Sequence, residues 1–270
     1  MLNRRILRIK AFKAIYCYAE NHGMTLKEAE ALLEISCEST RDLYLFLLAI
    51  VNPLTEEART RIETARAKFN PTEEELHPNL KFVQNRIAPI LRDDPDFSKL
   101  VSRKKLYWDQ YDMLLRRLYE RVRSRKYFKD YLASGEDSLE EDARLWVRIF
   151  EREFLENEDL AGILEDLSIH WNDDLDFALT WCCRSVRALG QGERWNLPPL
   201  YQSELPGNES FDSDKRFVVG LLRAAFLNYD KFTAQVAGLT PKWTLDRLCT
   251  TDLALIACGM AEAQMCPEVS

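Results

Sequence analysis

Residues 214–239, which read DKRFVVGLLRAAFLNYDKFTAQVAGL, decide the fold class. Apolar side chains recur in this stretch at steps of three and four residues, namely Phe217, Leu221, Ala225, Tyr229, Phe232 and Val236. This spacing puts them on one face of a helix, and we expect a break near Tyr229 and Asp230. Pro241 ends the pattern, because proline has no amide hydrogen and clashes with the preceding turn.

A second helix is expected over residues 251–263, TDLALIACGMAEA, after the motif WTLDRL at 243–248. Thr250 or Thr251 can cap this helix, and Asp252 lies in its first turn, where the helix dipole favours negative charge. The chain of 270 residues contains only 9 glycines and is 46% hydrophobic. Together with the lack of clean alternating apolar runs, this composition predicts an all-α protein with a sizeable core.

The N-terminal twenty residues form a basic element, with five basic side chains and one acidic side chain. Arg4, Arg5 and Arg8 lie within an arc of about 100° on an ideal helix. Such a cluster suits phosphate oxygens, because guanidinium groups are planar and carry several donors. From spacing alone, a phosphate-binding element and a solvated basic terminus both remain open.

The order of these parts resembles the NusB family of transcription antitermination factors. The family motif D-x-A-[IL]-[LI]-x-x-[GA]-x-x-E is matched by Asp252, Ala254, Leu255, Ile256, Gly259 and Glu262. The family's opening motif R-R-x-x-R-x-x-A-[LV]-[QK]-x-[LI]-Y is matched by Arg4, Arg5, Arg8, Ala11, Lys13, Ile15 and Tyr16, with Phe12 in the aliphatic place. The two matching ends, 1–20 and 214–270, cover less than a third of the chain.

The resemblance implies a NusB-like helical bundle without catalytic activity or cofactor. It implies binding of boxA-type single-stranded RNA together with the ribosomal protein NusE in the transcription elongation complex, in support of ribosomal RNA transcription in the cytoplasm. The RNA-binding role carries over to Arg4, Arg5, Arg8 and Lys13. The partner-binding role carries over to Tyr16 and Asp252.

The resemblance also divides the chain into segments. The expected segments are the arginine-rich helix 1–20, an enlarged helical insertion 21–189, a linker 190–213 and a NusB-like C-terminal helical domain 214–270. The linker is expected because three prolines and three glycines fall within it. The family continues beyond the D-x-A helix, so the C-terminal domain is expected either to be truncated here or to have lost that element.

An internal repeat is indicated by a shift of 72 residues, which lays 142–171 over 214–243 without a gap. The identical pairs are Asp142/Asp214, Arg144/Arg216, Val147/Val219, Phe154/Phe226, Leu155/Leu227, Leu167/Leu239 and Trp171/Trp243. Our hypothesis is therefore that residues 142–189 are a diverged copy of residues 214–261.

Residues 102–130 form a second basic stretch, with ten basic and four acidic side chains. Its basic and aromatic side chains alternate in a way that suits single-stranded RNA, through phosphate contacts and base stacking. The favoured alternative is a long amphipathic helix, with Tyr107, Tyr111 and Tyr119 in the core. Its arginines would then pair with the acidic stretch 134–176, which has fifteen acidic and three basic side chains.

Enzyme chemistry has no motif in the sequence. The three histidines are far apart and the seven cysteines are scattered, which predicts reduced thiols and no metal site. No apolar run reaches the length of a bilayer span, so no membrane partner is expected. Two alternatives to the antitermination role stay open, namely the NusB-like domain of a ribosomal RNA cytosine methyltransferase and a helical protein–protein scaffold.

Overall fold

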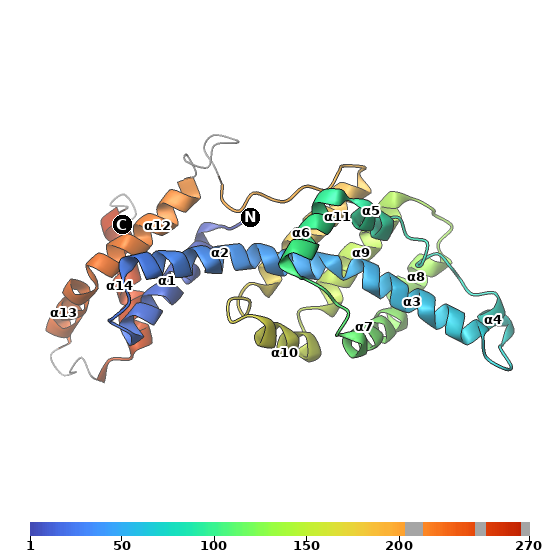
Figure 1. Cartoon of the computed structure of the whole chain (residues 1–270), viewed down its shortest axis with the longest axis horizontal. Coiled ribbons are helices and arrows are strands. Elements are labelled where there is room, and N and C mark those ends of the chain that lie inside the picture. The colour runs from blue at the N-terminus through green and yellow to red at the C-terminus, as the bar shows by residue number, and fades with distance from the viewer. Residues whose placement is uncertain (203–212, 241–246, 266–270) are drawn as a thin grey trace. The chain divides into compact units, whose positions relative to one another are not determined.

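The structure is a computed structural model that describes residues 1–202, 213–240 and 247–265. All regular secondary structure in these residues is helical, and none of them lies in a β-strand (Figure 1). The prediction of an all-α fold is therefore confirmed for the described residues. Within them, no helix is both long and apolar enough to cross a bilayer.

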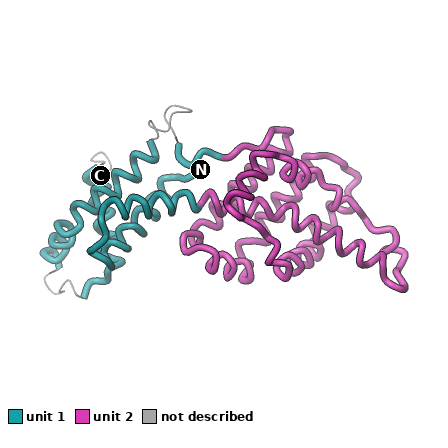
Figure 2. The backbone as a smooth tube through the Cα atoms, viewed as in Figure 1, with its two compact units in different colours: residues 1–39, 198–270 teal, residues 40–197 magenta. Residues whose placement is uncertain are grey.

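The first compact unit joins residues 1–39 and 198–270 (Figure 2). Its helices are the first part of α2 (Leu26–Ala49) together with α1 (Arg4–Glu20), α12 (Ser213–Leu227), α13 (Tyr229–Leu239) and α14 (Thr250–Met265). Helices α1, α12 and α14 each pack against the other two, and α13 packs against α14. The break between α12 and α13 falls at Asn228, next to the predicted position. The predicted motif residue Trp243 lies outside the described residues.

Small and aliphatic side chains at helical spacing build the core of this unit. The fully buried residues of its three main helices include Leu7, Ala11, Ile15, Val218, Leu222, Ala225, Ala254, Ala257 and Ala261. The three alanines follow each other at steps of three and four on α14, so they share one face of the helix. Short side chains at a helix contact allow the helix axes to approach closely, and this draws α14 against α1 and α12.

The second compact unit comprises residues 40–197. It contains the second part of α2 followed by α3 (Val51–Arg66), α4 (Glu73–Leu76), α5 (Ile87–Asp93), α6 (Pro95–Lys104), α7 (Asp112–Ser124), α8 (Lys126–Ala133), α9 (Leu139–Glu153), α10 (Glu158–Leu167) and α11 (Leu175–Gly190). Helix α9 is central, because it packs against α5, α7, α8 and α11. Trp146, Ile149 and Phe150 of α9 are completely buried.

Asn85 is a buried polar residue that joins three helices of the second unit. Its side-chain nitrogen donates to the hydroxyl of Thr55 at 3.2 Å and to the carbonyl of Phe82 at 2.7 Å. Its side-chain oxygen accepts from the backbone of Ala88 at 3.0 Å and from the indole of Trp146 at 3.1 Å. The amide is thus fully satisfied, as a buried polar group must be to avoid a desolvation penalty.

The boundaries of the compact units, after Ser39 and after Leu197, do not coincide with those of the predicted segments. The first boundary falls within α2, whereas the sequence suggests an insertion that begins at residue 21. The second falls within the predicted linker 190–213. Helix α11 ends at Gly190, residues 191–202 are not helical, and α12 begins at Ser213.

Gly190 marks a close approach of α11 to α9. A Cβ atom at this position would lie 2.5 Å from the Cβ of Ala143 and 3.7 Å from the Cα of Glu140. We expect Gly190→Ala to destabilise the second unit by about 1–3 kcal/mol, because overpacking forces two helices apart. The change is measured as the urea midpoint of tryptophan fluorescence, since five of the six tryptophans lie in residues 40–197.

Gly162→Ala on α10 is the matched control, because a Cβ there would have no atom within 4 Å. Alanine is the better helix former by about 1 kcal/mol, so this variant should be as stable as the parent or more stable. Equal stability of the two variants would contradict a tight contact at Gly190.

Candidate nucleic-acid interface

The arginine-rich end of α1 is fixed by its first turn. The side-chain oxygen of Asn3 accepts a hydrogen bond from the backbone of Ile6 at 3.0 Å and thereby caps the helix. The regular helix then places Arg4 and Arg8 one turn apart, with Arg5 about 100° around the axis. All three predicted arginines are exposed.

Arg4 connects α1 to α12. Its Nε donates to the Oδ1 of Asp214 at 3.0 Å, and its guanidinium carbon lies 4.1 Å from the ring centroid of Phe217. The Asp214 side chain is only 7% exposed, whereas the Arg4 side chain is 48% exposed. Arg4 therefore neutralises a buried carboxylate and still presents part of its guanidinium to solvent.

Arg8 connects α1 to α14 in a similar way. Its Nε lies 2.7 Å from Oε2 and 3.0 Å from Oε1 of Glu262, and a terminal nitrogen lies 2.5 Å from Oε1. The hydrogen bonds from Arg8 hold the pKa of Glu262 below its usual value. The pair thus joins the N-terminal arginine motif to the glutamate that ends the D-x-A motif.

The remaining predicted RNA-binding residues differ from one another. Arg5 is exposed and forms no ion pair with any residue in the described part of the chain. Lys13 is half-buried. Lys10 was not singled out by the sequence, yet it is buried, with 1% of its surface exposed. It lies three residues after Leu7 and four before Ala14, which places it on the apolar face of α1.

The two predicted partner-binding residues lie on different helices of the first unit. Tyr16 is 36% exposed near the end of α1, and its ring centroid is 6.4 Å from that of Phe12. Asp252 is exposed in the first turn of α14, where negative charge is favoured by the helix dipole. No hydrogen bond or ring contact joins Tyr16 to Asp252 among the described interactions.

The aromatic side chains of the second basic stretch serve mainly the core. Trp108 is buried, donates from its indole to the carbonyl of Phe46 at 2.8 Å and stacks on that ring at 4.2 Å. Tyr119 is also buried, whereas Tyr107 is 45% exposed. A ring that stacks on bases must have an open face, so Trp108 and Tyr119 are not available for such contacts. The expectation that Tyr107 lies in the core was wrong.

Three of the six arginines of this stretch pair with the acidic stretch, as the favoured alternative predicted, whereas Arg123 pairs with Glu120 inside the basic stretch itself. Arg117 binds Asp159 at 2.9 Å. Arg121 and Arg125 both bind Glu153, at 2.7 Å and 2.9 Å, and the Glu153 side chain is completely buried. The expectation of one long helix over 102–130 was wrong, because α6, α7 and α8 divide it.

Three residues with structural roles at the N-terminal arginines were missed by the sequence reasoning. Asp214 and Glu262 supply the carboxylates, and Phe217 supplies the ring beneath Arg4 and, at 5.5 Å, Arg8. Glu262 was part of the quoted family motif but had no assigned role. Its charge, opposite to that of the arginine motif, was a signal that could have suggested the pairing.

Comparison with known proteins finds no match among family models, curated proteins or solved structures. Within the described residues, no group of three histidine, cysteine, aspartate or glutamate side chains is placed to hold a metal ion. The motifs of the sequence and the geometry of the helices are therefore the basis for a function of this chain.

Proposed function

We propose that this chain is a NusB-type transcription antitermination factor that binds boxA-type single-stranded RNA together with NusE, within the elongation complex and in the cytoplasm. The observation that carries this proposal is the packing of the two motif-bearing ends, 1–20 and 214–270, into one unit. In that unit the arginine motif of α1 is bonded to the acidic residue of the D-x-A motif on α14, through Arg8 and Glu262. A contact between two motifs that lie far apart in the sequence supports kinship with the NusB family better than either motif alone.

The charges on α1 support a phosphate-binding role and indicate which of its arginines are most available to a phosphate. Arg5 has no ion pair within the described residues, so its guanidinium can bind a phosphate without losing a carboxylate partner. Arg4 bonds Asp214 through Nε, which leaves further donors on a group that carries five. In this proposal Arg5 makes the principal contact, Arg4, Arg8 and Lys13 assist it, and Tyr16 and Asp252 face NusE.

We also infer that residues 142–189 are a diverged copy of the C-terminal helical unit. Helices α9, α10 and α11 contain 15, 10 and 16 residues, and α12, α13 and α14 contain 15, 11 and 16 residues. The paired residues Asp142 and Asp214 are both buried. Each binds an arginine at the beginning of another helix, Arg86 before α5 and Arg4 in α1. This shared pairing of a buried aspartate with an arginine supports a duplication, because a shared apolar period alone would not produce it.

A helical protein–protein scaffold is the second candidate function. It is favoured by the second basic stretch, where three of the six arginines bind Glu153 or Asp159 of the acidic stretch within the second unit. A chain whose basic residues serve only internal pairs would not bind RNA in a salt-dependent way. The salt dependence of RNA binding therefore distinguishes the two candidate functions.

The test is fluorescence anisotropy of a labelled boxA-like RNA titrated with the chain, with and without NusE, at several salt concentrations. We expect binding that NusE strengthens and salt weakens, because bound phosphates release counterions. Arg5→Glu should weaken binding and reduce the slope of log K against log salt by about 0.7, the value for one contact to a single strand.

Arg66→Glu makes the same charge change at an exposed residue of α3 in the second unit and is the matched control. It should leave both the affinity and the salt slope close to those of the parent chain. If the parent shows no RNA binding with NusE present, or if both variants lose binding equally, the antitermination role fails and the scaffold becomes the better account.

A further inference from the structure

The outward face of α9 carries three exposed arginines at steps of four residues, Arg144, Arg148 and Arg152. Arg144 is neutralised, because it binds Glu136 at 2.6 Å and Glu140 at 3.1 Å. Arg148 makes no ion pair or hydrogen bond with any residue that the structure describes. Its guanidinium is therefore available to an external anion.

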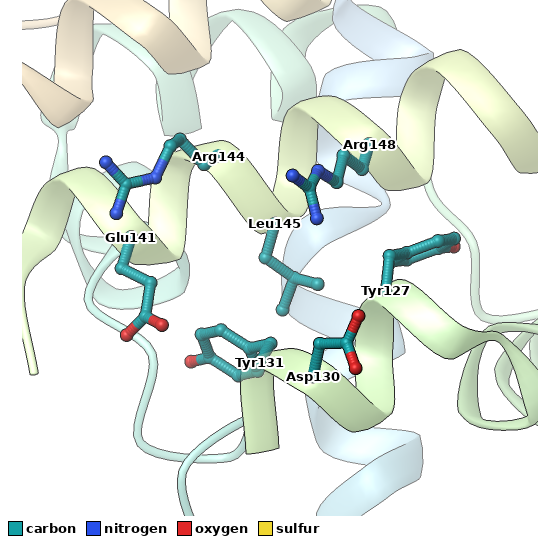
Figure 3. A pocket seen from close by; sticks show the side chains of 7 residues that line it. All are labelled: Tyr127, Asp130, Tyr131, Glu141, Arg144, Leu145 and Arg148. Atoms are coloured by element: carbon teal, nitrogen blue, oxygen red, sulfur yellow. The ribbon is translucent and has the colours of Figure 1, made fainter. Parts of the chain in front are cut away.

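Two pockets of the second unit meet at Arg148, and both are also lined by Arg144. The smaller one has a volume of about 170 Å³ and is lined by Tyr127, Tyr131 and Leu145 between α8 and α9 (Figure 3). The hydroxyls of both tyrosines are already bonded, to Glu153 at 2.9 Å and to Asp142 at 2.7 Å. This pocket therefore offers aromatic and aliphatic surface beside a free cation.

The larger pocket has a volume of about 370 Å³ and lies between α9 and α11. Its floor includes Ala143, Val147 and Gly190, where the two helices approach each other closely. Arg187 also lines it but is bound to Glu151 at 2.8 Å. This pocket thus offers a small apolar floor on the other side of Arg148.

We propose that the two pockets form one docking site for an extended peptide segment of a partner protein that carries one carboxylate between small apolar residues. A carboxylate of the peptide binds Arg148, and small apolar side chains on either side of it enter the two pockets. A guanidinium and a carboxylate make paired, charge-assisted hydrogen bonds. The site lies wholly in the second unit and does not depend on RNA binding by the first.

The charges around Arg148 favour a peptide with a single carboxylate over a nucleic acid. Three arginines line the two pockets, but so do four carboxylates, which are Asp130, Glu140, Glu141 and Glu151. Arg144 and Arg187 already bind carboxylates, so among the described residues of the pockets a polyanion would find one free guanidinium and would be repelled by the carboxylates around it. Both pockets are also open to solvent, whereas sites for small molecules usually enclose most of the ligand.

The experiment uses the full chain and an array of pentapeptides with aspartate, asparagine or lysine at the centre and all residues at the flanking positions. We expect the strongest spots to have a central aspartate between small apolar residues. The best aspartate peptide is then labelled and measured by anisotropy against its asparagine counterpart. The asparagine peptide should bind about tenfold more weakly, because it lacks the charge-assisted pair.

Arg148→Gln should weaken the binding of the aspartate peptide by a similar factor, about tenfold. Arg152→Gln is the matched control, because Arg152 is exposed one turn further on and lines neither pocket. Circular dichroism confirms that both variants fold. The proposal is overturned if no aspartate peptide binds at about 1 mM, if asparagine peptides bind as well, or if both variants lose equal affinity.

Discussion

Glu153→Gln is expected to lower the free energy of unfolding of the second unit by about 3 kcal/mol, the scale of breaking a buried charge cluster. The Glu153 side chain is completely buried and binds Arg121 at 2.7 Å and Arg125 at 2.9 Å. It also accepts from the hydroxyl of Tyr127 at 2.9 Å. Burial, assisted by the nearby Glu153 carboxylate, raises the pKa of Tyr127, so the phenol remains a donor.

The amide of glutamine has nearly the same shape but no negative charge, and its NH₂ group would face donors. Glu151→Gln is the matched control on the same helix, because the Glu151 side chain is 49% exposed and pairs with Arg187 at the surface. Exposed pairs contribute about 0–1 kcal/mol, so this variant should unfold close to the parent midpoint. Equal urea midpoints for the two variants would show that the buried cluster does not stabilise the unit.

Asn85→Leu is expected to lower the free energy of unfolding of the second unit by about 3 kcal/mol in the same urea experiment, although leucine is similar in size to asparagine. The change removes the acceptor of the Trp146 indole and of the Ala88 backbone, and both donors are buried. Each buried donor without a partner costs about 1–3 kcal/mol. The loss should also alter the tryptophan emission of the folded state, because Trp146 loses its hydrogen bond.

The control for this change is Asn79→Leu. Asn79 is exposed, and its side chain donates to the carbonyl of Leu132 at 2.8 Å and accepts from the backbone of Lys81 at 2.9 Å. Water can replace these bonds, so the expected cost is below about 1 kcal/mol. A cost at Asn85 no larger than that at Asn79 would contradict the role of Asn85 as a structural hub.

The sequence predicted helices best where apolar spacing and capping residues agreed. Thr25 is of a residue type that favours helix caps, and its hydroxyl and the Glu28 carboxylate each accept a hydrogen bond from the other's backbone at the start of α2. Ser39 is also of a capping residue type, but it lies inside α2. No glycine or proline interrupts residues 26–49, so the helical hydrogen bonds continue through a residue that could have started a new helix.

The divisions within 102–130 have no local signal in the sequence. Lys105 has a φ of 56°, in the left-handed region, and it ends α6. A lysine carries no signal for such a conformation, which is usually the place of glycine or asparagine. The burial of Trp108 then depends on Phe46, more than sixty residues earlier, and local periodicity contains no information about that contact.

The candidate site was likewise predictable only in part from local sequence. The spacing of Arg4, Arg5 and Arg8 was sufficient to place them at the exposed end of a helix, and all three are exposed. It could not distinguish Arg5 from the two arginines that hold Asp214 and Glu262, because those contacts span 210 and 254 residues. Arg148 was also missed, because its lack of a partner is a property of the folded surface.

The first unit has a particular consequence for synthesis on the ribosome. Helix α1 emerges early, but its partners α12 and α14 begin at Ser213 and Thr250. At a synthesis rate of about 5–20 residues per second, on the order of 10–50 s pass between the synthesis of α1 and that of α14. Residues 40–197 leave the ribosome during that interval and can fold first, because they form a unit of their own. The apolar face of α1 is then a natural target for chaperones on the nascent chain.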